Sequence, residues 1–443
     1  MNRFADRAKY SRRTLLEGVA ALTALGMGGC VTKAAPACAV NGFRYAVSVS
    51  PFTETVLSQC ALSDGQVRAT TVADVQRLFN AHGASEVYQR IATKRRTVQN
   101  GEADHGLDRG IERARLAHEL GMPFNPEIGT FANYGDVASH QEPPDFSDFP
   151  SIHLPGVWTD LTIEQMLDPL RQYGALVARE ILNTGVTVNV WDIGNEVECG
   201  MTGVAVRPLV NGATYVAPNN VDPELGRRSV MELIQMSESD RIAWCRAHLW
   251  PHIARLAGAV AQGIRSIDRG AKFSTHISSW GQKTPAIALA FWETMRENGY
   301  LPDHLGCSFW GLQGAGMQGP ADTMAWLRDT ASAFKQHFAR PMFIAEYGYP
   351  SAHMPPPFTW NDLQAGYGQD ADGQFRYTRD VIAWALESGA ISGVRPWAPD
   401  FCTSEGWAPM AWFARDGATA TARPVLGALS AALAQCQARP GPR

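Results

Sequence analysis

Short apolar stretches of strand length recur along the chain, and most are followed by a segment whose apolar residues have helical spacing. Alternation of fully apolar strands with amphipathic helices is typical of parallel βα units. The predicted strands lie at 44–49, 85–91, 122–128, 188–196, 272–278, 304–310, 341–350 and 391–397, and the predicted helices at 74–82, 112–120, 162–182, 240–267, 320–338, 374–388 and 424–436.

This pattern predicts an α/β fold, a single (β/α)₈ TIM barrel that occupies residues 42–436. Two of the predicted βα connections, 141–158 and 198–237, are long and polar. In such a barrel the βα loops lie on the catalytic face, so we expect extended loops around the site. The strand at 122–128 has the weakest pattern, because its two prolines limit ladder hydrogen bonding.

The first thirty residues read as a targeting segment. Arg12 and Arg13 precede an apolar run, residues 18–26, that is too short to span a bilayer, which predicts a twin-arginine export signal over residues 1–30. The run ends in a sequence that resembles a lipoprotein processing box, with Cys30 as the lipidated residue; ordinary cleavage near residues 35–39 is the alternative. Residues 31–41 are a linker. We therefore expect an exported protein that is periplasmic, anchored through Cys30 or secreted.

The charge and the cysteine content limit the expected binding partners, metal sites and disulfides. A net charge of −4 without a basic run argues against nucleic acid, and against any membrane contact other than a lipid on Cys30. We expect a monomer without cofactor or metal, since there is no zinc-ligand spacing and 145–148 lacks an EF-hand pattern. Cysteine spacing leaves Cys38–Cys60 and Cys199–Cys245 open as disulfides, while Cys307 reads as a buried thiol.

The candidate chemistry lies where two predicted strands end. Glu196 ends the strand at 188–196, and Glu346 lies near the end of the strand at 341–350. The carboxyl ends of parallel barrel strands meet at one rim, and facing carboxylates are what glycosidic bond cleavage needs. We predict that Glu196 is the acid/base and Glu346 the nucleophile of a retaining glycosidase. The alternative for each is a solvated loop glutamate.

Further strand ends carry candidate substrate-binding groups. Arg90 can hold Glu346 ionised, or can instead pair with a neighbouring helix at the surface. Asn195 can bind a sugar hydroxyl, and His276 is either a cleft residue or a satisfied polar contact. Two tryptophans at strand ends can stack on sugars or cap the core; these are Trp310 and Trp397.

Two of these motifs carry a resemblance to a known family. The run Ile193-Gly194-Asn195-Glu196, with Gly200-Met201 after it, and the run Ala345-Glu346-Tyr347-Gly348-Tyr349-Pro350 resemble glycoside hydrolase family 53, the arabinogalactan endo-β-1,4-galactanases. A looser likeness extends from about residue 72 to 399. The resemblance implies a retaining (β/α)₈ hydrolase with acid/base Glu196 and nucleophile Glu346.

Departures from the family pattern leave the substrate open. Phe309 and Trp310 stand where the family has two tyrosines, residues 125–128 replace an Asp-Phe-His run, and no Glu follows Trp397. We expect these positions to line the sugar subsites. Endo-β-1,4-galactan is the first expectation, and β-mannan, β-glucan or xylan are alternatives within the same clan. A non-catalytic glycan-binding barrel is the alternative from another class.

Overall fold

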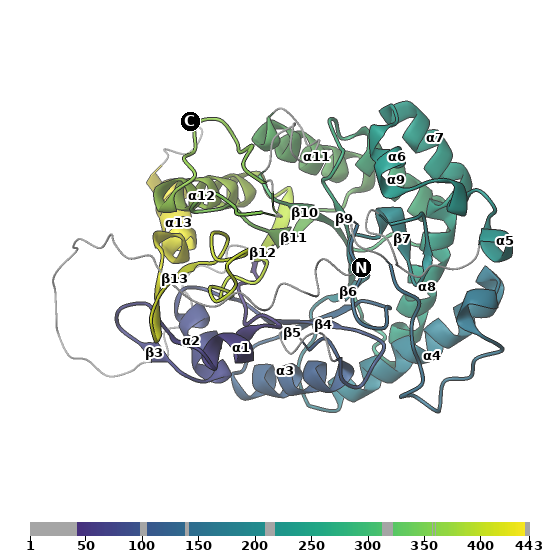
Figure 1. The fold of residues 1–443 in the computed structure, drawn as a ribbon, viewed down its shortest axis with the longest axis horizontal. Helices are drawn as coiled ribbons and strands as arrows, with labels where there is room; N and C mark the ends of the chain where they lie inside the picture. Colours follow the sequence, from purple (N-terminus) through teal and green to yellow (C-terminus); the bar gives the residue numbers. More distant parts are fainter. Residues whose placement is uncertain are drawn as a thin grey trace.

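The computed structural model describes residues 42–97, 104–137, 141–208, 218–311, 322–356, 358 and 360–438. Its centre is a curled sheet of parallel strands (Figure 1), with the order β1-β12-β11-β10-β9-β6-β5-β4. The strands are β1 (Arg44–Tyr45), β4 (Val87–Ile91), β5 (Phe124–Ile128), β6 (Trp191–Ile193), β9 (Phe273–Ser278), β10 (His304–Phe309), β11 (Met342–Tyr347) and β12 (Ile391–Pro396).

The two strands at the ends of this order meet each other. The N–H of Ser85, just before β4, donates to the carbonyl of Tyr45 in β1 at 2.9 Å. The N–H of Tyr88 in β4 donates to the hydroxyl of Ser48 at 2.9 Å. The sheet therefore curls far enough for its edges to hydrogen-bond, and the predicted α/β class is confirmed.

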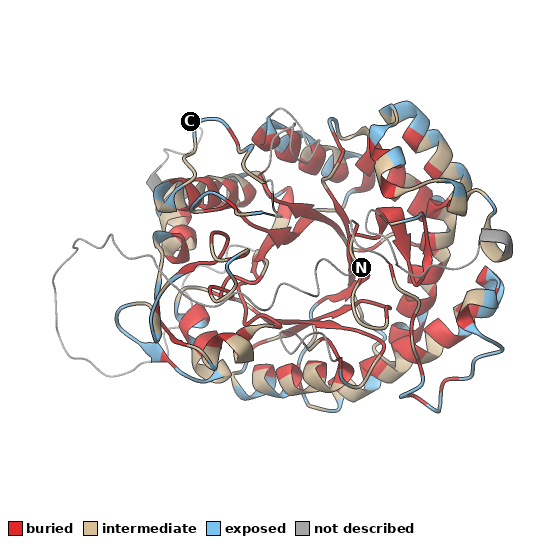
Figure 2. Cartoon of the chain, in the orientation of Figure 1, coloured by how far each residue is buried: buried red, intermediate tan, exposed pale blue. Residues whose placement is uncertain are grey.

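Helices surround the strands, and the sides of the helices that face the strands are buried (red in Figure 2). In α4, Met166, Leu170 and Tyr173 are fully buried, and a capping box at Thr162 begins the helix as predicted. The helices are α1 (Thr53–Leu57), α2 (Val72–Ala81), α3 (Leu107–Glu119), α4 (Ile163–Leu182), α5 (Pro218–Val221), α6 (Val230–Gln235), α7 (Glu238–His248), α8 (Trp250–Ile267), α9 (Ala286–Glu297), α11 (Thr323–Phe338), α12 (Ala371–Ser388) and α13 (Ala428–Ala438).

Three expectations about the elements are wrong in detail. The single helix predicted at 240–267 is two helices, α7 and α8, divided at Leu249, because Pro251 has no N–H to donate and its ring crowds the preceding turn. The strand predicted at 188–196 pairs only over β6, apart from one bridge between Val188 and Phe124. The strand predicted at 44–49 is limited to β1.

A second, smaller sheet was not predicted. It has the order β13-β14-β2-β3 and joins the N-terminal and C-terminal parts of the described chain. A short hairpin, β7 with β8, follows Glu196. Strands of two to four residues are too short to show a periodic pattern. These strands are β2 (Ala61–Ser63), β3 (Arg68–Ala69), β7 (Gly200–Met201), β8 (Val204–Ala205), β13 (Phe413–Asp416) and β14 (Thr419–Ala422).

The cysteines that lie in the described residues are all free thiols. The alternative of a Cys199–Cys245 disulfide is therefore wrong, while the expectation that Cys307 is a buried thiol is confirmed. Cys38 lies outside the described residues, as do the predicted export signal and linker. Within the described segments, no helix combines the length and the apolar character needed to cross a membrane.

Candidate active site

Arg90 links β4 to two parts of the chain that do not pair with it in the sheet. Its Nη2 donates to Glu346 Oε1 at 2.5 Å and to Asn195 Oδ1 at 2.8 Å. Arg90 comes from β4 and Glu346 from β11, whereas Asn195 follows β6. Arg90 is fully buried and Glu346 is 6% exposed. Hydrogen bonds between charged partners are the stronger kind, so this guanidinium fixes the position of the Glu346 carboxylate.

Glu196 is held at the end of β6 by an unusual backbone conformation. Gly194 has φ 79° and Glu196 itself has φ 48°, in the left-handed region that disfavours side-chain-bearing residues. A short 3₁₀ turn, Val197–Cys199, follows. Strained backbone of this kind persists where surrounding contacts over-determine it, and it gathers at functional sites.

His276 is the second donor to Asn195. Its Nε2 lies 2.8 Å from Asn195 Oδ1. Because Arg90 can only donate, Oδ1 is the acceptor for both neighbours, and His276 must carry its proton on Nε2. Burial, reinforced by the charges of Arg395 and Arg90, lowers the pKa of His276 well below its ordinary value. His276 is therefore a neutral donor inside β9.

The loop after β5 covers the Asn195–Glu196 pair. Asn195 Nδ2 donates to the carbonyl of Gly135 at 2.7 Å, and the N–H of Val137 donates to Glu196 Oε2 at 3.2 Å. Gln141 Nε2 donates to the carbonyl of Asn195 at 3.0 Å. Backbone groups of Gly135 and Val137 thus hydrogen-bond to the side chains of Asn195 and Glu196.

The two carboxyl groups differ in their protonation. Burial raises the pKa of Glu196 well above its ordinary value, and the charges of Glu346, Asp136 and Glu198 add to this rise. Burial also raises the pKa of Glu346, to about 7, but Arg90 acts against the rise. Glu346 therefore ionises more readily than Glu196, which keeps its proton to higher pH.

The raised pKa of Glu196 predicts that its carboxyl group lowers the stability of the folded protein at neutral pH. Because the folded pKa of Glu196 lies above the ordinary value of 4.5, its contribution to stability is complete below about pH 4.5 and is lost as the pH rises toward the folded value. Glu196→Gln should therefore raise the melting temperature by about 1–3 °C at pH 7 and leave it unchanged at pH 4. Calorimetry of this variant and of a control, Glu119→Gln at the exposed end of α3, measures it; an unchanged or lower value at pH 7 contradicts it.

The two predicted tryptophans have different surroundings. Trp397 follows β12 and packs over the Arg90 guanidinium, whose carbon lies 4.6 Å from the ring centroid. Trp310 follows β10 and packs against Trp360 and Trp407, with ring centroids 5.4 and 5.7 Å apart. Trp397 therefore adjoins the polar site directly, whereas Trp310 belongs to a cluster of aromatic rings built by three loops.

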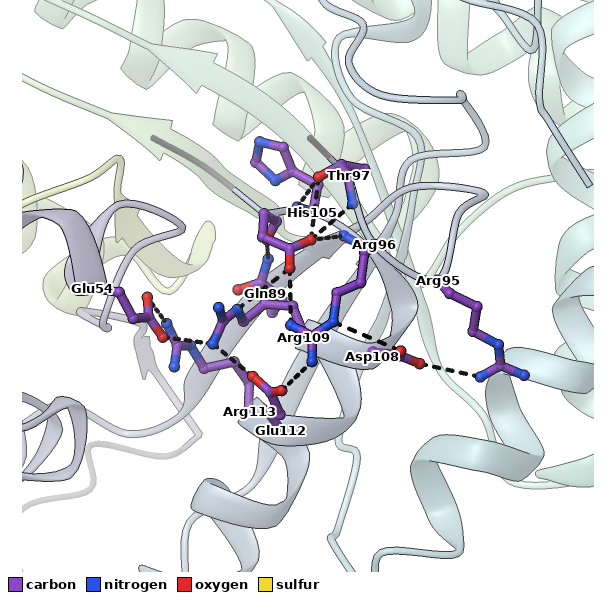
Figure 3. Close-up of polar contacts among 12 residues, drawn as sticks. Glu54, Gln89, Arg95, Arg96, Thr97, His105, Asp108, Arg109, Glu112 and Arg113 are labelled. Carbon is purple, nitrogen blue, oxygen red and sulfur yellow. Dashed lines mark hydrogen bonds and ion pairs between the residues drawn. The ribbon is translucent and has the colours of Figure 1, made fainter. Parts of the chain in front are cut away.

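A polar cluster secures the chain that follows β4 (Figure 3). Arg109 and Arg113 both donate to Glu54, at 2.7 and 2.8 Å, and Arg109 also donates to Glu112. His105 lies in the same cluster, where its backbone N–H donates to Thr97 Oγ1 at 2.7 Å. Burial lowers the pKa of His105 to about 3, with the charge of Arg90 acting in the same direction. The cluster keeps a neutral histidine near Arg90.

Sequence reasoning missed the groups beneath Arg90. Glu127, Asp192 and Arg395 are buried, charged and hydrogen-bonded to one another or to Arg90. The expectation that residues 125–128 line sugar subsites is wrong for Asn125 and Glu127, which are fully buried and bonded to the two arginines. The sequence did hold a signal for them: Asn125 and Glu127 are two positions apart in β5, so their side chains lie on the same face of the strand.

Comparison with known proteins identifies the family. The family model described as glycosyl hydrolase family 53 matches residues 55–422. The chain belongs to this family. It is a glycoside hydrolase, which confirms the resemblance seen in the sequence.

Individual relatives are distant. An "uncharacterized protein in bgaB 5'region" of Niallia circulans is 22% identical over 310 residues, which cover 68% of this chain and 70% of that protein. The family 53 catalytic domain of Ignisphaera aggregans is 15% identical with a TM-score of 0.62, covering 90% of this chain and 98% of that chain. A structure from a study of two fungal β-1,4-galactanases is 17% identical with a TM-score of 0.59, covering 87% and 99%. These likenesses confirm the (β/α)₈ barrel.

Proposed function

We propose that this glycoside hydrolase cleaves β-linked polysaccharide with retention of configuration, and that endo-β-1,4-galactan is its substrate. The observation that carries the proposal is the bonding of Arg90 to both Glu346 and Asn195, the residue beside Glu196. Glu196 directly follows Asn195, and the charge of Glu346 acts on the Glu196 carboxyl group, which supports a pair of carboxyl groups of the kind that glycosidic cleavage needs.

In the first step Glu346 is the nucleophile. One of its carboxylate oxygens attacks the anomeric carbon as the bond from that carbon to the glycosidic oxygen breaks. Glu196 transfers its proton to the departing oxygen, so the leaving group becomes a neutral alcohol. The product is a glycosyl ester on Glu346 and a carboxylate on Glu196.

In the second step Glu196 acts as a base. Its carboxylate takes a proton from a water molecule, whose oxygen attacks the anomeric carbon while the ester bond to Glu346 breaks. The sugar leaves with its original configuration, and both glutamates return to their starting protonation states.

The neighbouring groups have supporting roles in this proposal. Arg90 keeps Glu346 ionised and oriented, and Asn195, fixed by His276, binds a hydroxyl of the reacting sugar. Trp397 and Trp310 supply aromatic surface for sugar rings. Gly135 and Val137 hydrogen-bond to the side chains of Asn195 and Glu196. In this proposal that part of the loop therefore moves aside when a sugar binds.

The choice of galactan rests on family membership and on the likeness to fungal β-1,4-galactanases. Purified protein incubated with β-1,4-galactan, β-mannan, β-glucan and xylan should release reducing sugar fastest from galactan. Proton NMR of the first products should show the β-anomer before mutarotation. Release from another polymer alone overturns galactan, and an initial α-anomer overturns retention. Binding without turnover of any polymer or aryl β-glycoside favours the glycan-binding barrel.

A further inference from the structure

We propose that Glu127 is a positioning residue for the nucleophile, and that Glu127 and Arg395 balance the buried charges so that Glu346 carries the single surplus negative charge. This inference rests on the proposed role of Glu346.

Glu127 bridges the two arginines of the barrel interior. Arg90 Nε donates to Glu127 Oε1 at 2.5 Å, and Arg395 Nη2 donates to Glu127 Oε2 at 2.5 Å. Each carboxylate oxygen therefore serves one guanidinium. The other end of Arg90 reaches Glu346, so the position of the nucleophile depends on where Glu127 holds Arg90.

Arg395 secures the same nucleophile through the backbone. Its Nε donates to the carbonyl of Ala345 at 2.7 Å, the residue directly before Glu346. Its Nη1 donates to Asp192 Oδ2 at 2.5 Å and to Asn125 Oδ1 at 2.8 Å. Arg395 thus links β12 to β5, β6 and β11, and Glu346 is held by its side chain from one arginine and by its neighbouring peptide from the other.

The charges in this cluster cancel in pairs. Arg90, Arg395, Glu127 and Asp192 are at most 1% exposed, and they contribute two positive and two negative charges. Glu346 adds one more negative charge. When Glu346 becomes a glycosyl ester, the negative charge passes to Glu196, which gives its proton to the leaving oxygen, and the four charges around the two arginines balance. The surplus charge therefore lies on Glu346 before the first step and on Glu196 in the covalent intermediate, where it can take a proton from water.

Other titratable groups face Glu346 without disturbing this count. Tyr88 lies under the Arg395 guanidinium, 3.9 Å from its carbon, and Tyr134 lies on Arg90. Burial raises the pKa of both phenols above the ordinary value, so they are neutral. His276 is neutral, and Glu196 holds its proton.

The charge balance predicts that two substitutions shift the pH at which Glu346 ionises in opposite directions. Glu127→Gln removes a negative charge near Glu346, so the carboxylate should ionise at lower pH than in the wild-type protein. Arg395→Met removes a positive charge, so it should ionise at higher pH. Both directions agree with the charge contributions to the pKa of Glu346, which Glu127 raises and Arg395 lowers.

The test is the pH profile of kcat/KM on an aryl β-glycoside. Glu127→Gln should lower kcat on the order of 10- to 100-fold, because Arg90 loses its charged partner and is held less firmly, and should move the acidic limb to lower pH. Arg395→Met should move that limb to higher pH. A purely structural role would lower activity without moving the limb, and that result overturns the inference. If Arg395→Met does not fold, the limb of Glu127→Gln alone decides.

A matched control is available in the same barrel. Glu86 accepts from Arg44 at 2.7 and 3.0 Å in another buried ion pair. Glu86→Gln should leave the acidic limb in place, whatever it does to stability; movement of the limb in this variant would overturn the assignment to Glu127. Activity that survives Glu346→Ala refutes the proposed function, whereas loss of activity in Glu346→Ala with an unmoved limb in Glu127→Gln refutes only the present inference.

Discussion

Glu346→Ala is expected to lower kcat on an aryl β-glycoside by at least about 10⁴-fold. The substitution removes the oxygen that would form the bond to the anomeric carbon. It also deprives Arg90 of a hydrogen-bond partner at 2.5 Å, although Glu127 and Asn195 still hold that guanidinium in place. The site should therefore keep its shape and lose its nucleophile. Initial rates with the wild-type protein and the variant measure the loss.

Azide distinguishes loss of the nucleophile from damage to the fold. A small anion can enter the space left by the carboxylate and attack the same face of the anomeric carbon, which displaces the leaving group once and inverts the configuration. Azide should restore part of the activity of Glu346→Ala and yield an α-glycosyl azide, identified by NMR. Glu119→Ala, an exposed glutamate in α3, should neither lose activity nor respond. Full activity of Glu346→Ala without azide contradicts the assignment.

The sequence predicted the parts of this protein that depend on local pattern. Apolar runs that end in Glu196 and Glu346 mark strand ends, and parallel strands bring their ends to one rim. Arg90, Asn195 and His276 followed from the same reasoning, and the structure joins all three in one hydrogen-bonded group with Glu346. The roles proposed for them stay predictions until the variants are measured.

The features that could not be predicted from the sequence depend on the register of the strands and on the closure of the barrel. Glu127 and Arg395 are 268 residues apart, and only the pairing of all eight strands sets them on facing positions inside the barrel. The contacts of Gly135 and Val137 with the site arise from loop backbone, which carries no residue-specific signal. Hydrophobic period identifies a strand but not the partner of a buried charge on it.

Glu196→Ala is expected to slow the two steps unequally, and this difference identifies an acid/base residue. Without a proton donor, a substrate with a poor leaving group, such as an unactivated polysaccharide, should lose about 10²–10⁴-fold in kcat/KM. An aryl glycoside whose phenol leaves as an anion needs no proton, so its first step should be nearly unaffected. Hydrolysis of the ester on Glu346 still lacks its base, so the intermediate should accumulate.

Four results are expected for Glu196→Ala. The activated aryl glycoside should give a burst of phenol equal to the enzyme concentration, and mass spectrometry should find the glycosyl group on Glu346. Azide should accelerate turnover and form a β-glycosyl azide, because it attacks the intermediate in place of water. The alkaline limb of the pH profile should vanish, since the group whose raised pKa sets it has been removed. An equal loss on activated and unactivated substrates would mean that Glu196 holds the substrate and transfers no proton.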